Sequence, residues 1–362
     1  MMDSVESGTT VTQRDHFMKT RLLALKSAVP PFPIDQTAAA DRAGHLFQKV
    51  RDIERFMPVF VNTGIDKRYS CVPLDWYNES HGWVDRTALF VENAVNLLEE
   101  VTRKLLAEAK LKVEDIDTIV VASTTGVATP SLDALVVERL KMRRDIQRLP
   151  IFGLGCAGGV VGISRAAAMA EARPGSKVLY LVVELCALTF RKSDTSKSNI
   201  VATALFGDGA AGAILSTEGN GPRFEAMGEH TWPNSLDIMG WDVEEDGLKA
   251  RFAQSIPSLV AADFKQLLSE FLYRNDLKHS DIDAFACHPG GAKVLDALED
   301  AFGMQRGELV ESRDVLRDYG NMSAATVMFV LERMDWRAKN KRTMLTALGP
   351  GFSAAFLTLD SR

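Results

Sequence analysis

The residues best suited to chemistry lie in one glycine-rich turn, Gly153-Leu154-Gly155-Cys156-Ala157-Gly158-Gly159. An apolar run ends just before it at Phe152, and an alanine-rich helical pattern follows over Val161–Glu171. The pattern predicts a strand, a tight turn that carries Cys156, and a helix. The positive end of a helix favours a thiolate, which is the nucleophilic form of cysteine. Cys156 is therefore a candidate for covalent catalysis.

Two other interpretations of this turn stay open. Cys156 can be an inert buried thiol, because free cysteine is among the most buried residue types. The three glycines Gly153, Gly155 and Gly158 also fit the G-x-G-x-x-G fingerprint of dinucleotide-binding folds. Glu184 then stands where a ribose-binding acid belongs.

The composition limits the classes of function. The chain has 362 residues, of which 46% are hydrophobic and 25% charged, as in globular proteins. The net charge of −6 argues against general binding to nucleic acid or to an anionic membrane. No apolar segment is long enough to cross a bilayer, so no stable membrane insertion is expected. Met1–Arg14 is polar and lacks a signal-peptide core, which predicts a flexible tail.

The cysteines and histidines predict neither disulfides nor a metal site. Cys71, Cys156, Cys186 and Cys287 form no C-x-x-C pair. The six histidines show no ligand spacing. Unpaired cysteines in or near apolar runs indicate a reducing compartment, and we expect the cytoplasm.

Hydrophobic periodicity predicts an alternation of helices and strands. Helices are expected at Met18–Val29, Thr37–Phe56, Asp85–Leu111, Asp133–Arg143 and Pro257–Leu272, and strands at Asp115–Ala122, Lys177–Val183 and Ala210–Leu215. Arg55, Lys67 and Arg68 form either a solvated basic face or contacts to a phosphate-bearing substrate.

An internal repeat decides how these elements are arranged. Leu111-Lys112-Val113-Glu114-Asp115-Ile116-Asp117 is echoed by Leu277-Lys278-His279-Ser280-Asp281-Ile282-Asp283, at an offset of 277 − 111 = 166. The same offset carries Cys156 to position 322, inside the turn Tyr319-Gly320-Asn321-Met322-Ser323. Later strands at Thr343–Leu348 and Ser353–Leu359 match those of the first half. The chain is therefore predicted to be a duplicated α/β unit, with two sheets and equivalent helices packed face to face.

The duplication predicts that a thiol, an imidazole and an amide converge. Cys156 and Asn321 would each begin a central helix, and His288 would end a strand of the second half. His288 would accept the proton of Cys156, or its charge would stabilise the thiolate, so that Cys156 would be a thiolate at neutral pH. His288 and Asn321 would donate hydrogen bonds to a thioester oxygen in acyl transfer followed by decarboxylation. Taken singly, His288 can be a buried group with satisfied hydrogen bonds, and Asn321 a helix cap.

Several motifs resemble the type III polyketide synthases, the chalcone synthase family. They are Gly155-Cys156-Ala157-Gly158-Gly159, Leu205-Phe206-Gly207-Asp208-Gly209, His288-Pro289-Gly290-Gly291, Tyr319-Gly320-Asn321-Met322-Ser323 and Gly349-Pro350-Gly351-Phe352. The resemblance extends from about Thr37 to the C-terminus. Ketoacyl synthase III enzymes share the Cys-His-Asn set. The His-Pro-Gly-Gly and Gly-Asn-Met-Ser motifs, however, resemble the type III polyketide synthases more closely.

The resemblance implies a thiolase-like αβαβα fold of five layers, a homodimer, and no cofactor or metal. It implies a tail and arm at 1–36, a half carrying Cys156 at 37–218, and a half carrying His288 and Asn321 at 219–362. The implied substrates are acyl-CoA, loaded on Cys156, and malonyl-CoA. The implied substrate-binding residues are Phe206, Ala250, Thr129, Thr189, Ser323, Gly291 and Arg55.

Departures from the family pattern bear on the substrate. Ala250 and Thr129 stand where plant members carry a phenylalanine and a methionine, which would open room for a longer chain, whereas Trp241 replaces a small residue. In the basic cluster that binds CoA, Arg55 matches but Pro58 and Asn62 do not.

These features predict a fatty acyl starter, two or three malonyl extensions and release of an alkyl-α-pyrone. The alternatives are an alkylresorcinol-forming synthase, a ketoacyl synthase III-like enzyme, an NAD-dependent oxidoreductase and a non-catalytic protein of the condensing fold.

Overall fold

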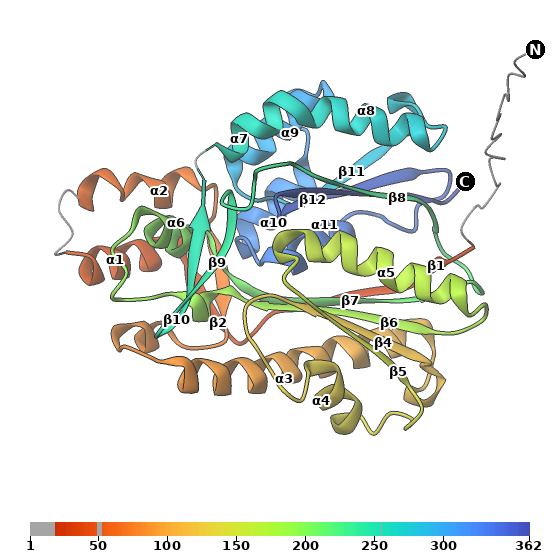
Figure 1. Cartoon of the computed structure of the whole chain (residues 1–362), viewed down its shortest axis with the longest axis horizontal. Helices are drawn as coiled ribbons and strands as arrows, with labels where there is room; N and C mark the ends of the chain where they lie inside the picture. The colour runs from red at the N-terminus through yellow and green to blue at the C-terminus, as the bar shows by residue number, and fades with distance from the viewer. Residues whose placement is uncertain (1–18, 49–52, 254) are drawn as a thin grey trace, which may run out of the picture.

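Five alternating layers of helix and sheet make up the fold (Figure 1). The computed structural model describes residues 19–48, 53–253 and 255–362. One outer layer holds α3 (Trp83–Ala109) and α4 (Leu132–Arg139), and the other holds α8 (Lys265–Arg274) and α9 (Ala292–Phe302). The central layer holds α5 (Gly158–Ala172) and α11 (Thr326–Arg333), between the two parts of the sheet. The five-layer thiolase-like prediction is confirmed, while the tail predicted at Met1–Arg14 lies outside the described residues.

The sheet has nine strands in the described chain, in the order β11-β12-β13-β8-β1-β7-β6-β4-β5. The strands of the first half are β1 (Arg21–Ala28), β4 (Thr118–Ser123), β5 (Gln147–Phe152), β6 (Val178–Leu185) and β7 (Asp208–Ser216). Those of the second half are β8 (Arg223–Thr231), β11 (Ala284–Cys287), β12 (Arg342–Gly349) and β13 (Ser353–Asp360). The two halves are not separate sheets as predicted, because Arg21 of β1 pairs with Arg223 of β8.

The helix predicted over Met18–Val29 is wrong, since Arg21–Ala28 forms strand β1. Its side chains are buried on both faces. Leu22 and Leu25 pack in the cluster around the central helices, and Ala24 packs under α3. A strand covered on both faces reads as a nearly continuous apolar run, which periodicity cannot distinguish from a buried helix.

Other predicted elements are recovered with shifted ends. The Thr37–Phe56 helix is realised as α1 (Gln36–Leu46) and a 3-10 turn at Ile53–Arg55. The Pro257–Leu272 helix divides into α7 (Ile256–Leu259), a π-helical turn (Val260–Phe264) and α8.

The repeat is visible in matching hydrogen bonds. In the first copy the Lys112 amide donates to Asp115, at 2.7 Å, and in the second the Lys278 amide donates to Asp281, at 2.8 Å. The last aspartate of each copy also accepts a hydrogen bond from a backbone amide at the start of a distant strand. Asp117 accepts from Lys177, just before β6, at 2.8 Å, and Asp283 accepts from Arg342, the first residue of β12, at 2.7 Å. The two sequence copies therefore build the same turn before β4 and β11.

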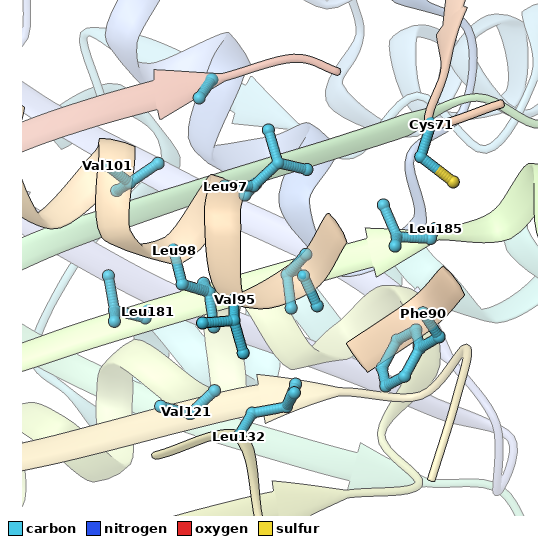
Figure 2. Close-up of a cluster of buried hydrophobic side chains, with 14 of the residues drawn as sticks. Cys71, Phe90, Val95, Leu97, Leu98, Val101, Val121, Leu132, Leu181 and Leu185 are labelled. Carbon is cyan, nitrogen blue, oxygen red and sulfur yellow. The ribbon is translucent and has the colours of Figure 1, made fainter. Parts of the chain in front are cut away.

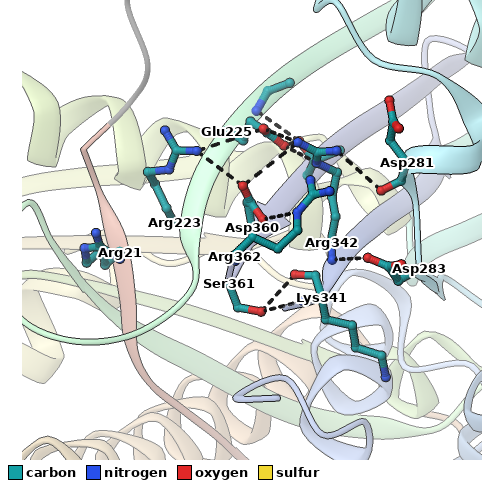
Figure 3. Close-up of polar contacts among 12 residues, drawn as sticks. Arg21, Arg223, Glu225, Asp281, Asp283, Lys341, Arg342, Asp360, Ser361 and Arg362 are labelled. Atoms are coloured by element: carbon teal, nitrogen blue, oxygen red, sulfur yellow. Dashed lines mark hydrogen bonds and ion pairs between the residues drawn. The ribbon is translucent and has the colours of Figure 1, made fainter. Parts of the chain in front are cut away.

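Ion pairs link neighbouring strands of the sheet near the C-terminus (Figure 3). Arg342 of β12 donates through two nitrogens to the Glu225 carboxylate of β8, each at 2.6 Å. Arg223 pairs with Asp360 at the end of β13, at 3.3 Å. These contacts join three strands of the second half at the end of the layers opposite α1 and α2 (Figure 1).

The remaining described elements gather at that other end: β2 (Phe32–Asp35), α1, α2 (Pro58–Asn62), β3 (Lys67–Ser70), α6 (Lys197–Leu205), β9 (Met239–Glu244), β10 (Gly247–Phe252) and α7. The remaining helix, α10 (Val310–Tyr319), leads into the turn before α11.

Three large hydrophobic clusters hold the described elements together, one under α3, one around α5 and α11, and one under α8 and α9. Figure 2 shows α3 side chains, among them Phe90, Val95 and Leu98, packing against Val121 of β4 and Leu181 of β6. On the other face of the sheet, α5 and α11 approach closely because α5 begins with two glycines. A Cβ atom built on Gly159 would lie 2.3 Å from the Ala324 carbonyl oxygen and 2.5 Å from Val327 Cγ1. The absence of a side chain at Gly159 therefore sets how closely the two halves approach.

Replacement of Gly159 by alanine should destabilise the protein by about 1–3 kcal/mol, because the added methyl group meets backbone atoms that cannot move aside alone. The measurement is urea unfolding followed by circular dichroism. Gly240→Ala is the matched control, since nothing lies within 4 Å of the position of its added methyl group. Equal stability of the two variants would contradict the close approach.

Candidate active site

Cys156 lies in a 3-10 turn, Gly155–Ala157, between β5 and α5, as predicted. Gly155 has φ +47°, and a side chain there would lie 2.5 Å from Cδ of Pro350. The Gly155 amide donates to Thr124 Oγ1 at 3.0 Å, which ties the turn to the end of β4. The thiol is 7% exposed. A glycine is required here both by the left-handed backbone and by the Pro350 loop that packs on it.

Asn321 lies in the matching turn of the second half, just before the 3-10 turn Ser323–Ala325. The turns match at an offset of 323 − 155 = 168, so Ala324 rather than residue 322 is the counterpart of Cys156. Asn321 Oδ1 accepts from the Ser323 amide at 2.8 Å, and Nδ2 donates to the Gly290 carbonyl at 3.3 Å. These bonds fix which end of the amide is the donor.

The backbone of Asn321 is bonded to the first half of the chain. Its amide donates to the Leu205 carbonyl at 2.9 Å, and its carbonyl accepts from the Gly207 amide at 3.0 Å. Arg68 holds the same segment from the other side, since its Nη1 donates to the Phe206 carbonyl at 3.1 Å. Arg68 is buried, so its predicted role on a solvated or phosphate-binding face is wrong. Burial lowers its pKa to about 10, which leaves it charged at neutral pH.

His288 directly follows β11, and its amide donates to the Thr346 carbonyl of β12 at 2.8 Å. The side chain is buried, and neither ring nitrogen has a hydrogen-bond partner within the described chain. A buried imidazole without hydrogen bonds costs free energy, and buried polar groups of this kind normally have a partner. Both ring nitrogens of His288 are therefore free to form a hydrogen bond with a bound ligand.

A cavity of about 570 Å³ brings these three side chains together. Cys156, His288 and Asn321 line it, with backbone and apolar groups from both halves. The apolar lining residues include Val59, Ile200, Val201, Leu205, Met239, Phe252, Ile256, Val294 and Leu298. The predicted Arg55 and Gly291 also line this cavity.

Burial keeps both reactive groups neutral in this arrangement. It raises the pKa of Cys156 to about 12; a hydrogen bond with the Ser323 side chain opposes this shift, and the nearby Glu184 carboxylate adds to it. Burial also lowers the pKa of His288 to about 3. The sequence predicted a thiolate of Cys156 at neutral pH, but this structure favours the neutral thiol. The positive end of the helix lowers the pKa of the thiol by less than burial raises it. A thiolate at Cys156 would therefore need a positive charge nearby to stabilise it.

A polar network lies behind Cys156. Glu184 is fully buried and accepts from the Thr124 amide at 3.0 Å and from Thr125 Oγ1 at 2.9 Å. Burial raises its pKa to about 7, although these bonds and one to Ser323 oppose the shift. Ser323, which was predicted to bind substrate, contacts both Cys156 and Glu184. The Ser123-Thr124-Thr125-Gly126 turn was the available signal for this network.

The other predicted substrate residues lie away from this cavity. Phe206 and Thr189 line a separate small cavity of about 60 Å³. Ala250 is buried in a cluster with Cys186, Ala202 and Phe206. The rings of Trp241 and Phe252 lie 5.7 and 5.5 Å from that of Phe206, and they occupy the space beside Ala250. Thr129 is exposed and lines neither of these two cavities.

Comparison with known sequences identifies the family. The family description "Chalcone and stilbene synthases" matches as an N-terminal domain at residues 9–219 and as a C-terminal domain at 225–359. The chain belongs to the chalcone and stilbene synthase family. It is a type III polyketide synthase, an acyltransferase of the thiolase superfamily.

Individual relatives agree over nearly the whole chain. A putative chalcone synthase of Bacillus subtilis is 33% identical, covering 93% of this chain and 97% of the relative. A 1,3,6,8-tetrahydroxynaphthalene synthase of Streptomyces peucetius is 34% identical, covering 94% and 93%. The alpha-pyrone synthesis polyketide synthase-like Pks18 of Mycobacterium tuberculosis is 28% identical, covering 93% and 90%.

Among solved structures, the 1,3,6,8-tetrahydroxynaphthalene synthase of Streptomyces coelicolor superposes with a TM-score of 0.90 at 26% identity, covering 94% of this chain and 99% of that one.

The family assignment excludes the dinucleotide-binding alternative, and the geometry gives the reason. Gly158 and Gly159 face Ala324 of the other half, which leaves no room for a pyrophosphate. Glu184 is fully buried and cannot reach a ribose. Within the described residues no cluster of side chains could hold a metal ion, and no helix has the length and apolar character to span a bilayer.

Replacement of His288 by glutamine should slow alkylation of Cys156 by iodoacetamide at least about tenfold below pH 8, because the thiol loses its base while burial still raises its pKa. The measurement is the alkylation rate between about pH 6 and pH 9, which should rise about tenfold per pH unit in the variant. His279→Gln, at an exposed histidine, is the control. The same rates in His288→Gln and wild type would contradict the proton transfer.

Proposed function

We propose that this chain condenses an acyl-CoA starter with malonyl-CoA by decarboxylative Claisen condensation and releases an alkyl-α-pyrone. The observation that carries the proposal is the single cavity lined by Cys156, His288 and Asn321 together with many apolar side chains. A fatty acyl chain fits such a lining better than a polar starter does.

The loading step uses Cys156 and His288. The proton of the thiol passes to His288 as Sγ attacks the starter thioester carbonyl. The tetrahedral oxyanion accepts a hydrogen bond from Nδ2 of Asn321, whose other end is held by the Ser323 amide. Collapse of this intermediate expels the CoA thiolate, which takes the proton back from His288, and leaves the acyl group on Cys156.

The extension step uses His288 and Asn321 as donors. Malonyl-CoA loses CO2, and its thioester oxygen gains the negative charge of an enolate. Two donors aimed at that oxygen lower the barrier to decarboxylation. The enolate carbon then attacks the acyl thioester on Cys156 and frees its sulfur, so the chain is now on CoA and two carbons longer. Transfer of this chain back to Cys156, with release of CoA as in the loading step, allows the next extension. Attack of an enol oxygen on the thioester after two or three extensions closes the pyrone and releases CoA.

A second candidate is a synthase with an aromatic product, as in the relatives named 1,3,6,8-tetrahydroxynaphthalene synthase. The observation that favours it is the aromatic cluster of Phe206, Trp241 and Phe252, which fills the space beside Ala250. Less room there would favour a small starter. An alkylresorcinol formed by aldol closure is a third possible product of the same chemistry.

We also infer a homodimer in the cytoplasm. The edge strand β5 carries Phe152, whose side chain is 61% exposed. Val127, two residues before Thr129, is 52% exposed. An unpaired edge with exposed apolar side chains is a common site of association. Light scattering should therefore give twice the chain mass of 39.7 kDa, whereas a monomer would contradict the dimer.

Incubation with malonyl-CoA and acyl-CoAs from acetyl to stearoyl, followed by mass spectrometry of the products, tests the proposal. We expect alkyl-α-pyrones from the longer starters and none from Cys156→Ala. Trp241→Ala should extend the range to longer chains, because it removes the largest side chain beside Ala250.

Aromatic products from malonyl-CoA alone would support the second candidate and contradict the first. Full activity of Cys156→Ala would contradict both.

A further inference from the structure

A groove of about 340 Å³ lies near the C-terminus, at the end of the layers opposite α1 and α2. Figure 3 shows three of its lining residues, Arg223, Asp360 and Arg362. Among the described residues, none lines both this groove and the cavity that contains Cys156. The groove is therefore separate from the candidate active site.

Positive side chains dominate the lining of this groove. The cationic residues that line it are Arg21, Arg223, Arg337, Lys339 and Arg362. Within the described lining, Asp360 is the one acidic side chain, and a carboxylate that ends the chain at Arg362 adds one further negative charge. The whole chain, in contrast, has 48 acidic against 42 basic side chains. The groove is thus a local concentration of positive charge, which attracts anions.

These cations come from four separate segments of the chain. Arg21 is the first residue of β1 and Arg223 the first residue of β8, and the two residues pair across the junction of the two halves. Arg337 and Lys339 lie between α11 and β12, and Arg362 follows β13. The groove therefore lies over the seam where the sheets of the two halves join.

The carboxylates near the groove are shared among its cations. Asp360 lies 3.3 Å from Arg223 and 2.9 Å from Arg362, so one carboxylate serves both arginines. Arg337 pairs with Glu108 at 3.2 Å. These two carboxylates do not neutralise all five cations of the lining.

Two of the cations have no carboxylate partner in the part of the chain that the structure describes. The side chain of Lys339 is exposed and has neither a hydrogen bond nor an ion pair there. Arg21 donates through Nη1 to the Gly221 carbonyl at 2.9 Å, and its other N–H groups have no partner there. A guanidinium carries five N–H donors, so Arg21 can bind a further acceptor.

The type and number of these groups match phosphate oxygens. Guanidinium groups form paired hydrogen bonds with phosphate, and four of the five cations are arginines. The volume of the groove is in the range of small-molecule sites, so it suits a small anion rather than a segment of another protein.

We propose that this groove binds a small ligand with two linked phosphate groups, across the junction of β1 and β8. One phosphate group would lie between Arg21 and Arg223, and the other among Arg337, Lys339 and Arg362. Such a ligand ties the first half of the chain to the second. Because it binds the folded chain and not the unfolded one, it raises the thermal stability.

The test is isothermal titration of the protein with inorganic pyrophosphate, with phosphate and with ADP. Pyrophosphate should bind about tenfold more tightly than phosphate, and at saturation it should raise Tm by about 2–4 °C. The double variant Lys339→Gln with Arg362→Gln should bind pyrophosphate about tenfold more weakly, since it removes two of the five cations.

The matched control is Lys265→Gln with Arg274→Gln, which removes two exposed cations of α8 that do not line the groove. It should bind pyrophosphate as the wild type does. A control loss as large as that of the groove variant would indicate unspecific attraction to net charge and overturn the proposal.

The ADP titration identifies the part of the ligand that is recognised. Equal Kd values for ADP and pyrophosphate support recognition of the diphosphate alone, and tighter binding of ADP supports a nucleoside diphosphate. An unchanged Kd for pyrophosphate in the groove variant, or no binding of either diphosphate at millimolar concentration, overturns the proposal. Binding needs no turnover, so this result is independent of the proposed function.

Discussion

The close approach of the two halves at the start of α5 is the constraint on which the site depends. Gly158 and Gly159 let the backbone around Ala324 come within contact distance, and this places the turns of Cys156 and Asn321 against each other. His288, which follows β11, lines the same cavity as these two turns. Cys156 from one copy of the repeat and His288 and Asn321 from the other therefore line one cavity, which neither half contains alone.

Burial gives this site its chemical character. The thiol and the imidazole are both held neutral, since desolvation disfavours either charge in isolation. Neutral donors suit an enolate oxygen, because they stabilise its charge without protonating it fully. Behind them, Glu184 and Ser323 link the nucleophile to the end of β4.

The sequence predicted what depends on local pattern and on the repeat. The offset between the two Leu-Lys-x-x-Asp-Ile-Asp segments led to Asn321 and His288. The structure shows the same backbone hydrogen bond to an aspartate in both of these segments. Strand β1 was misassigned because burial on both faces removes its alternation. The enclosure of Phe206 and Ala250 depends on how the Trp241 side chain packs against them, which the spacing of residues in the sequence does not reveal.

The central claim is that Cys156 is the residue that carries the growing chain. The most direct measurement is peptide mass spectrometry of the protein after brief incubation with an acyl-CoA. The account predicts one acyl group per chain, on the peptide that contains Cys156. An acyl group on Cys71, Cys186 or Cys287 instead, or product formation with no acylated intermediate on Cys156 at any time, would contradict it.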